Sequence, residues 1–423
     1  MTDSNKTSGL NRRQALFGAA ATVAAAKALF PSGAFAAGKG PEVAAAKLGF
    51  IALTDSSPLI IAKERGLFAK YGMPDVEVLK QASWAATRDN IVLGSQGGGI
   101  DGAHILSPMP YLITTGQAAK ATPMYILARL NVNGQAISVG NDLKGVQVGL
   151  NSAPMKAKFA QMKAAGDMAK VAMTFRGGTH DLWLRYWLAA GGINPDTECS
   201  TIVIPPPQMV ANMKAGTQDA FCVGEPWNGQ LVDQHLGYTA TTTSEIWMNH
   251  PEKALGMRAD WVDKHPNAAK ALIAATMEAA QWCDKNRAAM CAISAGRQYI
   301  NVPINDIVPR LQGTIDYGDG RKVTNSPHVM KFWADFAAFP FKSHDAWFIT
   351  ENKRWGNFAA DLNTSVLVNK VNRADLWRDV AKSYGIATPA SDSRGVEKFF
   401  DGKVFDPANP DAYLASQSIK KLS

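Results

Sequence analysis

Short apolar runs typical of β-strands alternate with helical segments from residue 46 onward, and this alternation most strongly constrains the fold. The first part of the chain gives predicted strands at residues 47–52, 76–78, 101–105 and 124–130. Helix signals lie between them: Ser57 and Pro58 supply an N-cap and a first-turn proline, and Ser83 caps the next helix. The sequence therefore predicts an α/β fold with a mainly parallel sheet that is covered by helices on both faces.

A second unit of the same kind follows a cluster of turn residues at 131–134. Its predicted strands cover residues 136–139, 146–150, 201–204 and 220–223. Thr179 is expected to cap a helix over residues 181–190. Helices dominate after residue 250, beginning with residues 267–283, and the last part of the chain reads as a mostly irregular wrap. Two α/β units predict a ligand cleft between them.

The first 36 residues have the parts of an export signal. Arg12 and Arg13 precede a weakly apolar, alanine-rich segment, as in twin-arginine signals, which export proteins already folded. Ala34 and Ala36 supply the small residues that a signal peptidase reads. Pro31 and Lys27 interrupt the segment short of the roughly 20 apolar residues of a spanning helix. We therefore expect residues 1–36 to be removed and the mature protein to reach the periplasm through the twin-arginine machinery.

Charge and cysteines exclude some classes of function. The formal charge is +8, but the basic residues are scattered, so we expect no nucleic-acid partner. The four cysteines are too few for a disulfide scaffold and fit no zinc pattern. A Cys199–Cys222 disulfide and four free buried thiols both remain open. No serine-hydrolase elbow, phosphate loop or His-Glu-x-x-His motif is present. We predict that the protein is not an enzyme and needs no cofactor or metal.

Two motifs favour an anion site. Gly177-Gly178-Thr179-His180 brings the backbone close and places a histidine in the first turn of a helix, where free N–H groups attract anions. The segment from Val223 to Asn228 ends a strand at Gly224, whose backbone N–H could face a ligand. Each motif alone also fits a purely structural role, as a packed histidine or a strand-to-helix turn.

Three further residues are candidates for ligand binding, and each could instead have an ordinary structural or surface role. Trp84 stands at a predicted helix start and could donate its indole N–H, although it could equally be a core tryptophan. Gln135 follows the turn cluster and could be an exposed strand end. Lys253 could be a solvated surface lysine.

Taken together, these segments resemble the periplasmic solute-binding proteins of nitrate, nitrite and bicarbonate ABC importers, over essentially the whole mature chain. The resemblance rests on Gly66-Leu67-Phe68-Ala69-Lys70-Tyr71-Gly72, Gly178-Thr179-His180-Asp181-Leu182-Trp183, Val223-Gly224-Glu225-Pro226-Trp227-Asn228 and His250-Pro251-Glu252-Lys253. The first segment is shared with sulfonate- and taurine-binding relatives. The other three are more specific to the nitrate branch.

The resemblance implies a two-lobed, type II-like periplasmic binding protein, in which each lobe is a mixed or parallel sheet flanked by helices and the ligand cleft lies at the hinge. Lobe 1 would comprise residues 44–134 plus 252–423, including a C-terminal extension, and lobe 2 residues 135–251. The ligand-binding residues that match the family are Trp84, Gln135, His180, Gly224 and Lys253. The implied partners are nitrate or nitrite and the permease and ATPase subunits of an ABC importer, with peripheral association at the cytoplasmic membrane.

Ligand chemistry agrees with that set. Nitrate is a planar monoanion with only acceptor oxygens, so its ideal site offers donors and positive charge. Bicarbonate carries a hydroxyl and would favour an acceptor as well, so Lys253 favours nitrate or nitrite. The alternatives are a bicarbonate importer component and a cytoplasmic nitrate-sensing regulatory protein. The Arg12-Arg13 signal favours import over sensing.

Overall fold

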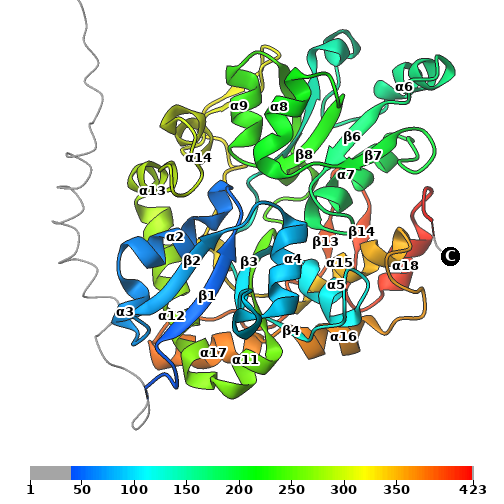
Figure 1. Ribbon diagram of the computed structural model, residues 1–423. Coiled ribbons are helices and arrows are strands. Elements are labelled where there is room, and N and C mark those ends of the chain that lie inside the picture. Colours follow the sequence, from blue (N-terminus) through cyan, green and yellow to red (C-terminus); the bar gives the residue numbers. More distant parts are fainter. Residues whose placement is uncertain (1–39, 422–423) are drawn as a thin grey trace, which may run out of the picture.

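The computed structural model describes residues 40–421, which form two lobes, each around a five-stranded sheet (Figure 1). The expected signal segment, residues 1–36, lies outside the described residues. The first sheet has the order β2-β1-β3-β10-β4. Its strands are β1 (Ala45–Phe50), β2 (Asp75–Lys80), β3 (Gly102–Leu106), β4 (Met124–Arg129) and β10 (Lys253–Arg258).

The second sheet repeats this arrangement in the order β7-β6-β8-β5-β9. Its strands are β5 (Gln135–Gly140), β6 (Lys170–Met173), β7 (Ser200–Val203), β8 (Ala220–Gly224) and β9 (Gly237–Thr242). In both sheets the strand that follows a crossing between the lobes runs antiparallel to its neighbours: β5 beside β8 and β9, and β10 beside β3 and β4. Each sheet is therefore mixed, with one antiparallel strand among parallel ones, as the mixed or parallel sheets of the expected fold allow.

The strand predictions fail in one place and are incomplete in others. No strand covers residues 146–150, because η3 (Asn141–Val146) is a 3-10 turn and Gln147 has a left-handed backbone with φ of 52°. A left-handed residue cannot continue an extended strand. Strands β6, β9 and β10 were not predicted. The lobe boundaries at residues 134 and 252 stay an interpretation of how the two sheets divide the chain.

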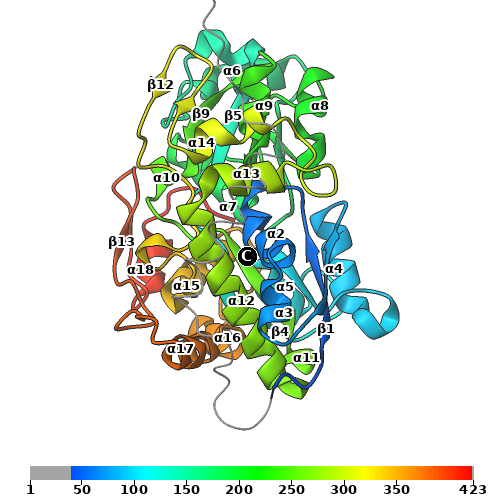
Figure 2. The same cartoon turned by 90° about the vertical axis from the view of Figure 1, so that its left-hand side faces the viewer.

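Helices flank both sheets (Figure 2). In the first lobe they are α2 (Ser57–Glu64), α3 (Leu67–Lys70), α4 (Trp84–Leu93) and α5 (Met109–Thr115). In the second lobe they are α6 (Met155–Ala164), α7 (Thr179–Ala190), α8 (Met209–Lys214), α9 (Trp227–Asp233) and α10 (Thr243–Ile246). After β10 come α11 (Ala259–Lys264), α12 (Pro266–Lys285), α13 (Arg287–Ser294), α14 (Val308–Leu311), α15 (Lys342–Arg354), α16 (Thr364–Val371), α17 (Ala374–Ser383) and α18 (Pro410–Ala415). Within residues 40–421 no helix combines the length and apolar character needed to cross a membrane.

Helix caps follow the sequence only in part. Ser83 caps α4 as predicted, since its hydroxyl accepts the Ala86 N–H at 3.1 Å. Thr179 is not a cap: Gly178 holds the cap position, and the Thr179 hydroxyl donates to Glu252 instead. Ser57 is not a cap either: it is the first residue of α2, with Pro58 in the first turn, and Ser56 holds the cap position.

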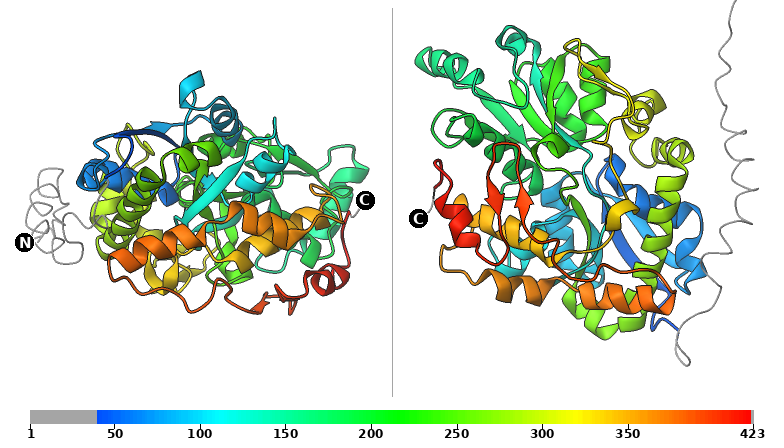
Figure 3. Two further views of the ribbon diagram at one scale, coloured as in Figure 1. Left: turned by 90° about the horizontal axis from the view of Figure 1, so that it is seen from below. Right: turned by 180° about the vertical axis from the view of Figure 1, so that it is seen from behind.

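The chain beyond residue 340 joins the two lobes along one side (Figure 3). Helices α16 and α17 pack on β4 of the first lobe, whereas α15 packs on α7 of the second. Trp347 of α15 stacks on Trp183 of α7 with 4.8 Å between ring centroids. The final segment carries a short hairpin of β13 (Glu397–Lys398) and β14 (Val404–Phe405) and is otherwise mostly irregular, as expected.

All four cysteines are free and buried, so the Cys199–Cys222 disulfide that the sequence left open is not formed.

A buried ion pair anchors α15 to the first sheet. Arg129, at the end of β4, pairs with Asp345, and neither side chain is exposed to solvent. The other oxygen of Asp345 accepts a 2.7 Å hydrogen bond from Asn372. Such a pair gives little net stability when intact, but removing one partner leaves a buried charge without compensation.

We therefore expect Asp345→Ala to lower the free energy of unfolding by about 3–5 kcal/mol in urea denaturation. Asp375→Ala is the matched control, because Asp375 pairs with Arg373 at 2.6 Å with its side chain 60% exposed. The control should cost less than about 1 kcal/mol. Equal losses in both variants would contradict the structural role given to Asp345.

Candidate functional site

The two crossings between the lobes bring the candidate residues together. Gln135 begins β5 directly after the first crossing, and Lys253 begins β10 directly after the second. Gln135 lies opposite Gly224, the last residue of β8, in the second sheet. His180 is in the first turn of α7, and Trp84 is the first residue of α4. The structure thus gathers all five candidate residues between the lobes.

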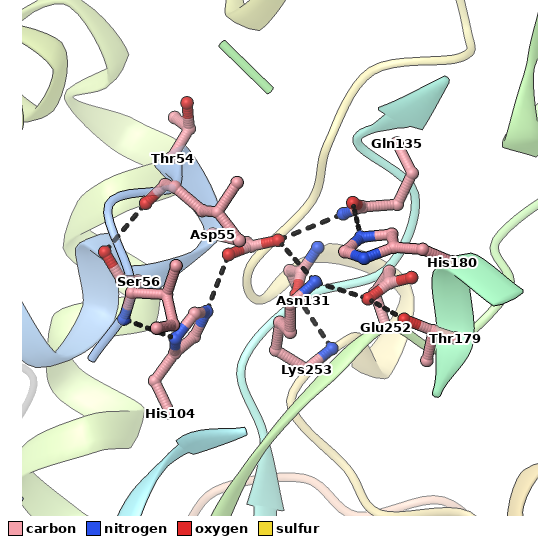
Figure 4. Close-up of polar contacts among 12 residues, drawn as sticks. Thr54, Asp55, Ser56, His104, Asn131, Gln135, Thr179, His180, Glu252 and Lys253 are labelled. Carbon is pink, nitrogen blue, oxygen red and sulfur yellow. Dashed lines mark hydrogen bonds and ion pairs between the residues drawn. The ribbon is translucent and has the colours of Figure 1, made fainter. Parts of the chain in front are cut away.

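A chain of polar contacts connects three of these residues through Asp55 (Figure 4). One oxygen of Asp55, Oδ2, lies 2.9 Å from Lys253 Nζ and accepts a 3.0 Å hydrogen bond from Gln135 Nε2. The other, Oδ1, is 2.6 Å from His104 Nε2. Gln135 Oε1 is 2.7 Å from His180 Nε2. Asp55 lies in the turn η1 (Thr54–Ser56), shortly after β1, so first-lobe and second-lobe side chains meet on one carboxylate.

Gly224 and Trp84 complete the cluster in different ways. A Cβ atom at Gly224 would lie 2.6 Å from Gln135 Oε1 and 3.1 Å from Leu53 Cδ2, so any other residue would displace the Gln135 amide from this position. The Trp84 ring lies 5.4 Å from the His104 ring, and Lys253 Nζ is 5.8 Å from its centroid. Trp84 Nε1 is buried and has no hydrogen-bond partner among residues 40–421. The site therefore contains an indole donor that no described protein group uses.

Glu252 places a second carboxylate beside the lysine. Its Oε2 accepts hydrogen bonds from Lys253 Nζ at 2.5 Å and from the Thr179 hydroxyl at 3.0 Å. Its Oε1 accepts the Trp183 indole N–H at 3.0 Å. Lys253 is fully buried, so its alternative reading as a surface lysine is wrong.

The sequence argument missed Asp55, Glu252 and His104. Glu252 lies inside the quoted His250-Pro251-Glu252-Lys253 motif, and Asp55 closely follows the first apolar strand, where strand-end polar groups collect in α/β proteins. The described residues therefore form a site that contains hydrogen-bond acceptors as well as donors. Two carboxylates share the lysine.

Burial and charge set the protonation of the cluster. Burial alone would raise the pKa of Asp55, but Lys253 and His104 outweigh it and hold the pKa well below its usual range. Burial raises the pKa of Glu252, and Lys253 only partly opposes this. Burial would lower the pKa of Lys253, but the two carboxylates reverse the effect and raise it.

Burial also lowers the pKa of each nearby histidine, His104, His180 and His250, the last to about 3. The cluster therefore combines one lysine whose pKa is raised, histidines whose pKa is lowered and two carboxyl groups whose pKa values are shifted in opposite directions. Among residues 40–421 no group of three or more histidine, cysteine, aspartate or glutamate side chains is placed to hold a metal ion.

The cluster is sealed from water. Asp55, His180 and Lys253 are fully buried, and Gln135 is 1% exposed. Two hydrogen bonds tie the lobes together beside it: Thr54 N–H to Glu225 O at 2.8 Å, and Trp227 Nε1 to Ala52 O at 3.0 Å. A small anion could lie here only between the closed lobes.

Comparisons with known proteins agree with the two-lobed fold. The NMT1-like family matches residues 39–295. The nitrate/nitrite binding protein NrtA of Synechocystis sp. is 58% identical over 390 residues, covering 90% of this chain and 86% of that protein. The crystal structure of the periplasmic nitrate-binding protein NrtA from Synechocystis PCC 6803 has a TM-score of 0.88 and 58% identity, covering 90% of this chain and 100% of that one. The fold is thus that of a periplasmic binding protein.

Two further relatives are more distant. The bicarbonate-binding protein CmpA of Synechococcus elongatus is 41% identical, covering 99% of this chain and all of that protein. The nitrate import ATP-binding protein NrtC of Synechocystis sp. is 34% identical over 91% of this chain and 57% of its own length.

Proposed function

The chain belongs to the NMT1-like family and to the family of the nitrate/nitrite binding proteins, and we therefore propose that it captures nitrate or nitrite in the periplasm for an ABC importer. The observation that carries the proposal is the buried cluster of Gln135, His180 and Lys253 beside the unpartnered Trp84 indole, between two lobes. Nitrate needs donors and positive charge, which these groups supply. In this proposal the protein binds the anion and releases it to a permease with its ATPase, and it catalyses no reaction.

Ligand entry requires the lobes to separate, because the cluster is buried. The two crossings, residues 130–134 and 243–252, are the covalent links that pass next to the site. We infer that they act as the hinge. Hinges of this kind let two rigid lobes close around a ligand and expel its water.

Bicarbonate import is the second candidate function, and the two carboxylates of the site are the observation that favours it. Asp55 and Glu252 could accept the bicarbonate hydroxyl, which nitrate lacks. The lower identity to the bicarbonate-binding relative, 41% against 58%, favours nitrate.

Calorimetric titration of residues 37–423 with nitrate, nitrite, bicarbonate and taurine, in separate runs at one pH, tests the proposal. We expect saturable binding of nitrate or nitrite. Binding of bicarbonate alone would replace the proposal with the second candidate, and binding of none of the four anions would leave only the fold.

Trp84→Phe tests one residue of the site. The change removes the indole N–H but keeps an aromatic ring beside His104. A hydrogen bond to a charged group contributes about 1.5–3 kcal/mol, so the dissociation constant for nitrate should rise about tenfold or more. The free energy of unfolding should change little through hydrogen bonding, because the indole N–H has no protein partner among the described residues.

Trp377→Phe is the matched control for this variant. Trp377 is also buried with an unpartnered indole N–H in the described chain, but it stacks on Trp333, away from the candidate site. It should leave nitrate affinity unchanged. Equal affinity in the Trp84 variant and the unmodified protein would remove Trp84 from the proposed ligand set.

We also propose that the twin-arginine machinery exports the folded protein, on the strength of Arg12 and Arg13 before the apolar segment. Replacing both arginines by lysine keeps the charge and should leave the precursor in the cytoplasm in a fractionation assay. Replacing Lys6 by arginine is the control and should not affect export. Normal processing of the double-lysine variant would contradict this route.

A further inference from the structure

Charge balance in the sealed site raises a problem for anion binding. Lys253 pairs with Asp55 at 2.9 Å and with Glu252 at 2.5 Å, and all three side chains have no solvent exposure. With both carboxylates ionised the trio carries one net negative charge. A bound nitrate would make it two, in a space without water. Burying an uncompensated charge is very costly, and proteins avoid it by changing the protonation of a group.

We propose that nitrate capture takes up one proton and that Glu252 holds it. The inference rests on the proposed function and adds to it a coupling between the anion and a proton. The site then carries the same net charge with its ligand as without it, because nitrate takes over the negative charge that Glu252 gives up. Both carboxylates are buried once the lobes close around the ligand. The net charge of the closed, ligand-bound site is therefore the same whether the free protein is open or closed.

Asp55 is a poor acceptor for this proton because its neighbours only donate. The His104 Nδ1 atom faces the Ile51 N–H at 3.5 Å, so its Nε2 carries the hydrogen that points at Asp55. The amide of Gln135 and the ammonium of Lys253 donate to the other oxygen. A proton on Asp55 would find no acceptor, whereas the carboxylate satisfies all three donors.

Glu252 differs because one of its neighbours can reverse. The Thr179 hydroxyl donates to Glu252 Oε2, but a hydroxyl can also accept. A protonated Glu252 can donate to Thr179 from Oε2 and keep the Trp183 indole on Oε1. Lys253 is then released from Oε2 to face the anion. Burial also raises the pKa of Glu252, in keeping with this assignment.

Because the His180 Nδ1 atom lies 2.5 Å from the Thr174 hydroxyl, which can also accept, His180 competes for the proton with Glu252. The titratable groups around Glu252 are Lys253 and His250 on its own segment, Asp55 on η1, His104 on β3, His180 on α7 and Cys222 on β8. The histidines have a lowered pKa from burial, and burial raises the pKa of the Cys222 thiol, so it stays protonated.

Calorimetry of the mature protein with sodium nitrate measures the proton directly. Titrations at one pH in phosphate and in Tris, which differ in ionisation heat, give the number of protons exchanged. We expect uptake of about one proton per nitrate, and a dissociation constant that rises with pH by up to about tenfold per unit. The sign follows from mass action, because a proton that enters on binding becomes scarcer as pH rises.

Two variants locate the proton. Glu252→Gln cannot titrate, so its binding should take up no proton and its affinity should not depend on pH. Thr179→Val removes the hydroxyl that accepts from protonated Glu252, so proton uptake at neutral pH should fall and nitrate affinity with it. Glu278→Gln is the matched control: Glu278 is also a buried glutamate bonded to a lysine, Lys70, at 2.8 Å, but it lies on α12, and this variant should retain the uptake of the unmodified protein.

The outcomes distinguish failure of the proton coupling from failure of nitrate binding itself. Nitrate binding with the same observed heat in phosphate and in Tris, meaning no proton uptake, overturns this inference and leaves the proposed function intact. Absence of nitrate binding overturns both. Full proton uptake in Glu252→Gln overturns the assignment to Glu252. If that variant does not fold, the proton count of the unmodified protein and the Thr179→Val result decide.

Discussion

A lysine ammonium with no access to water must have its charge balanced inside the protein, and much of the structure around the cleft follows from this requirement. Asp55 and Glu252 both contact Lys253 Nζ, Asp55 from η1 and Glu252 from the position just before β10. The neighbouring histidines stay neutral because burial lowers their pKa. The site is thus organised around one cation and two carboxylates, so an added anion must change the protonation or the pairing of these groups.

The site residues could be predicted from the sequence more readily than the order and direction of the strands, and the second crossing between the lobes shows why. Short motifs such as Gly178-Thr179-His180 and Gly224-Glu225-Pro226 are local, and both lie at the cleft. β10 gives no local sign that it returns antiparallel between β3 and β4, because that pairing joins residues far apart in sequence. The alternation near Val148 looked like a strand, yet the left-handed backbone of Gln147 ends the extended conformation there. Asp55 and Glu252 were not predicted because a buried carboxylate can be identified only from the groups around it, and those groups come from distant parts of the sequence.

Support for Glu252 extends into the C-terminal part of the chain. Trp183, which donates to Glu252, stacks on Trp347 of α15 at 4.8 Å and lies 4.5 Å from the His250 ring. The Arg129–Asp345 pair fixes α15 to the first sheet, so this stack links both lobes behind the carboxylate. The C-terminal segment therefore contributes to the orientation of a polar group in the cleft, although none of its residues was a candidate ligand.

Charge balance also bears on how such a site distinguishes nitrate from bicarbonate under the proposed function. Both are planar monoanions of similar size, so shape separates them weakly. Bicarbonate brings a hydroxyl that an ionised Glu252 or Asp55 could accept, whereas nitrate offers only acceptors and is repelled by both carboxylates. Protonation of Glu252 weakens this preference, because it removes one repelling charge and frees Lys253 to face the ligand. Selectivity in this cleft then depends on the hydrogen bond between Thr179 and Glu252, which allows the carboxyl group to be neutral.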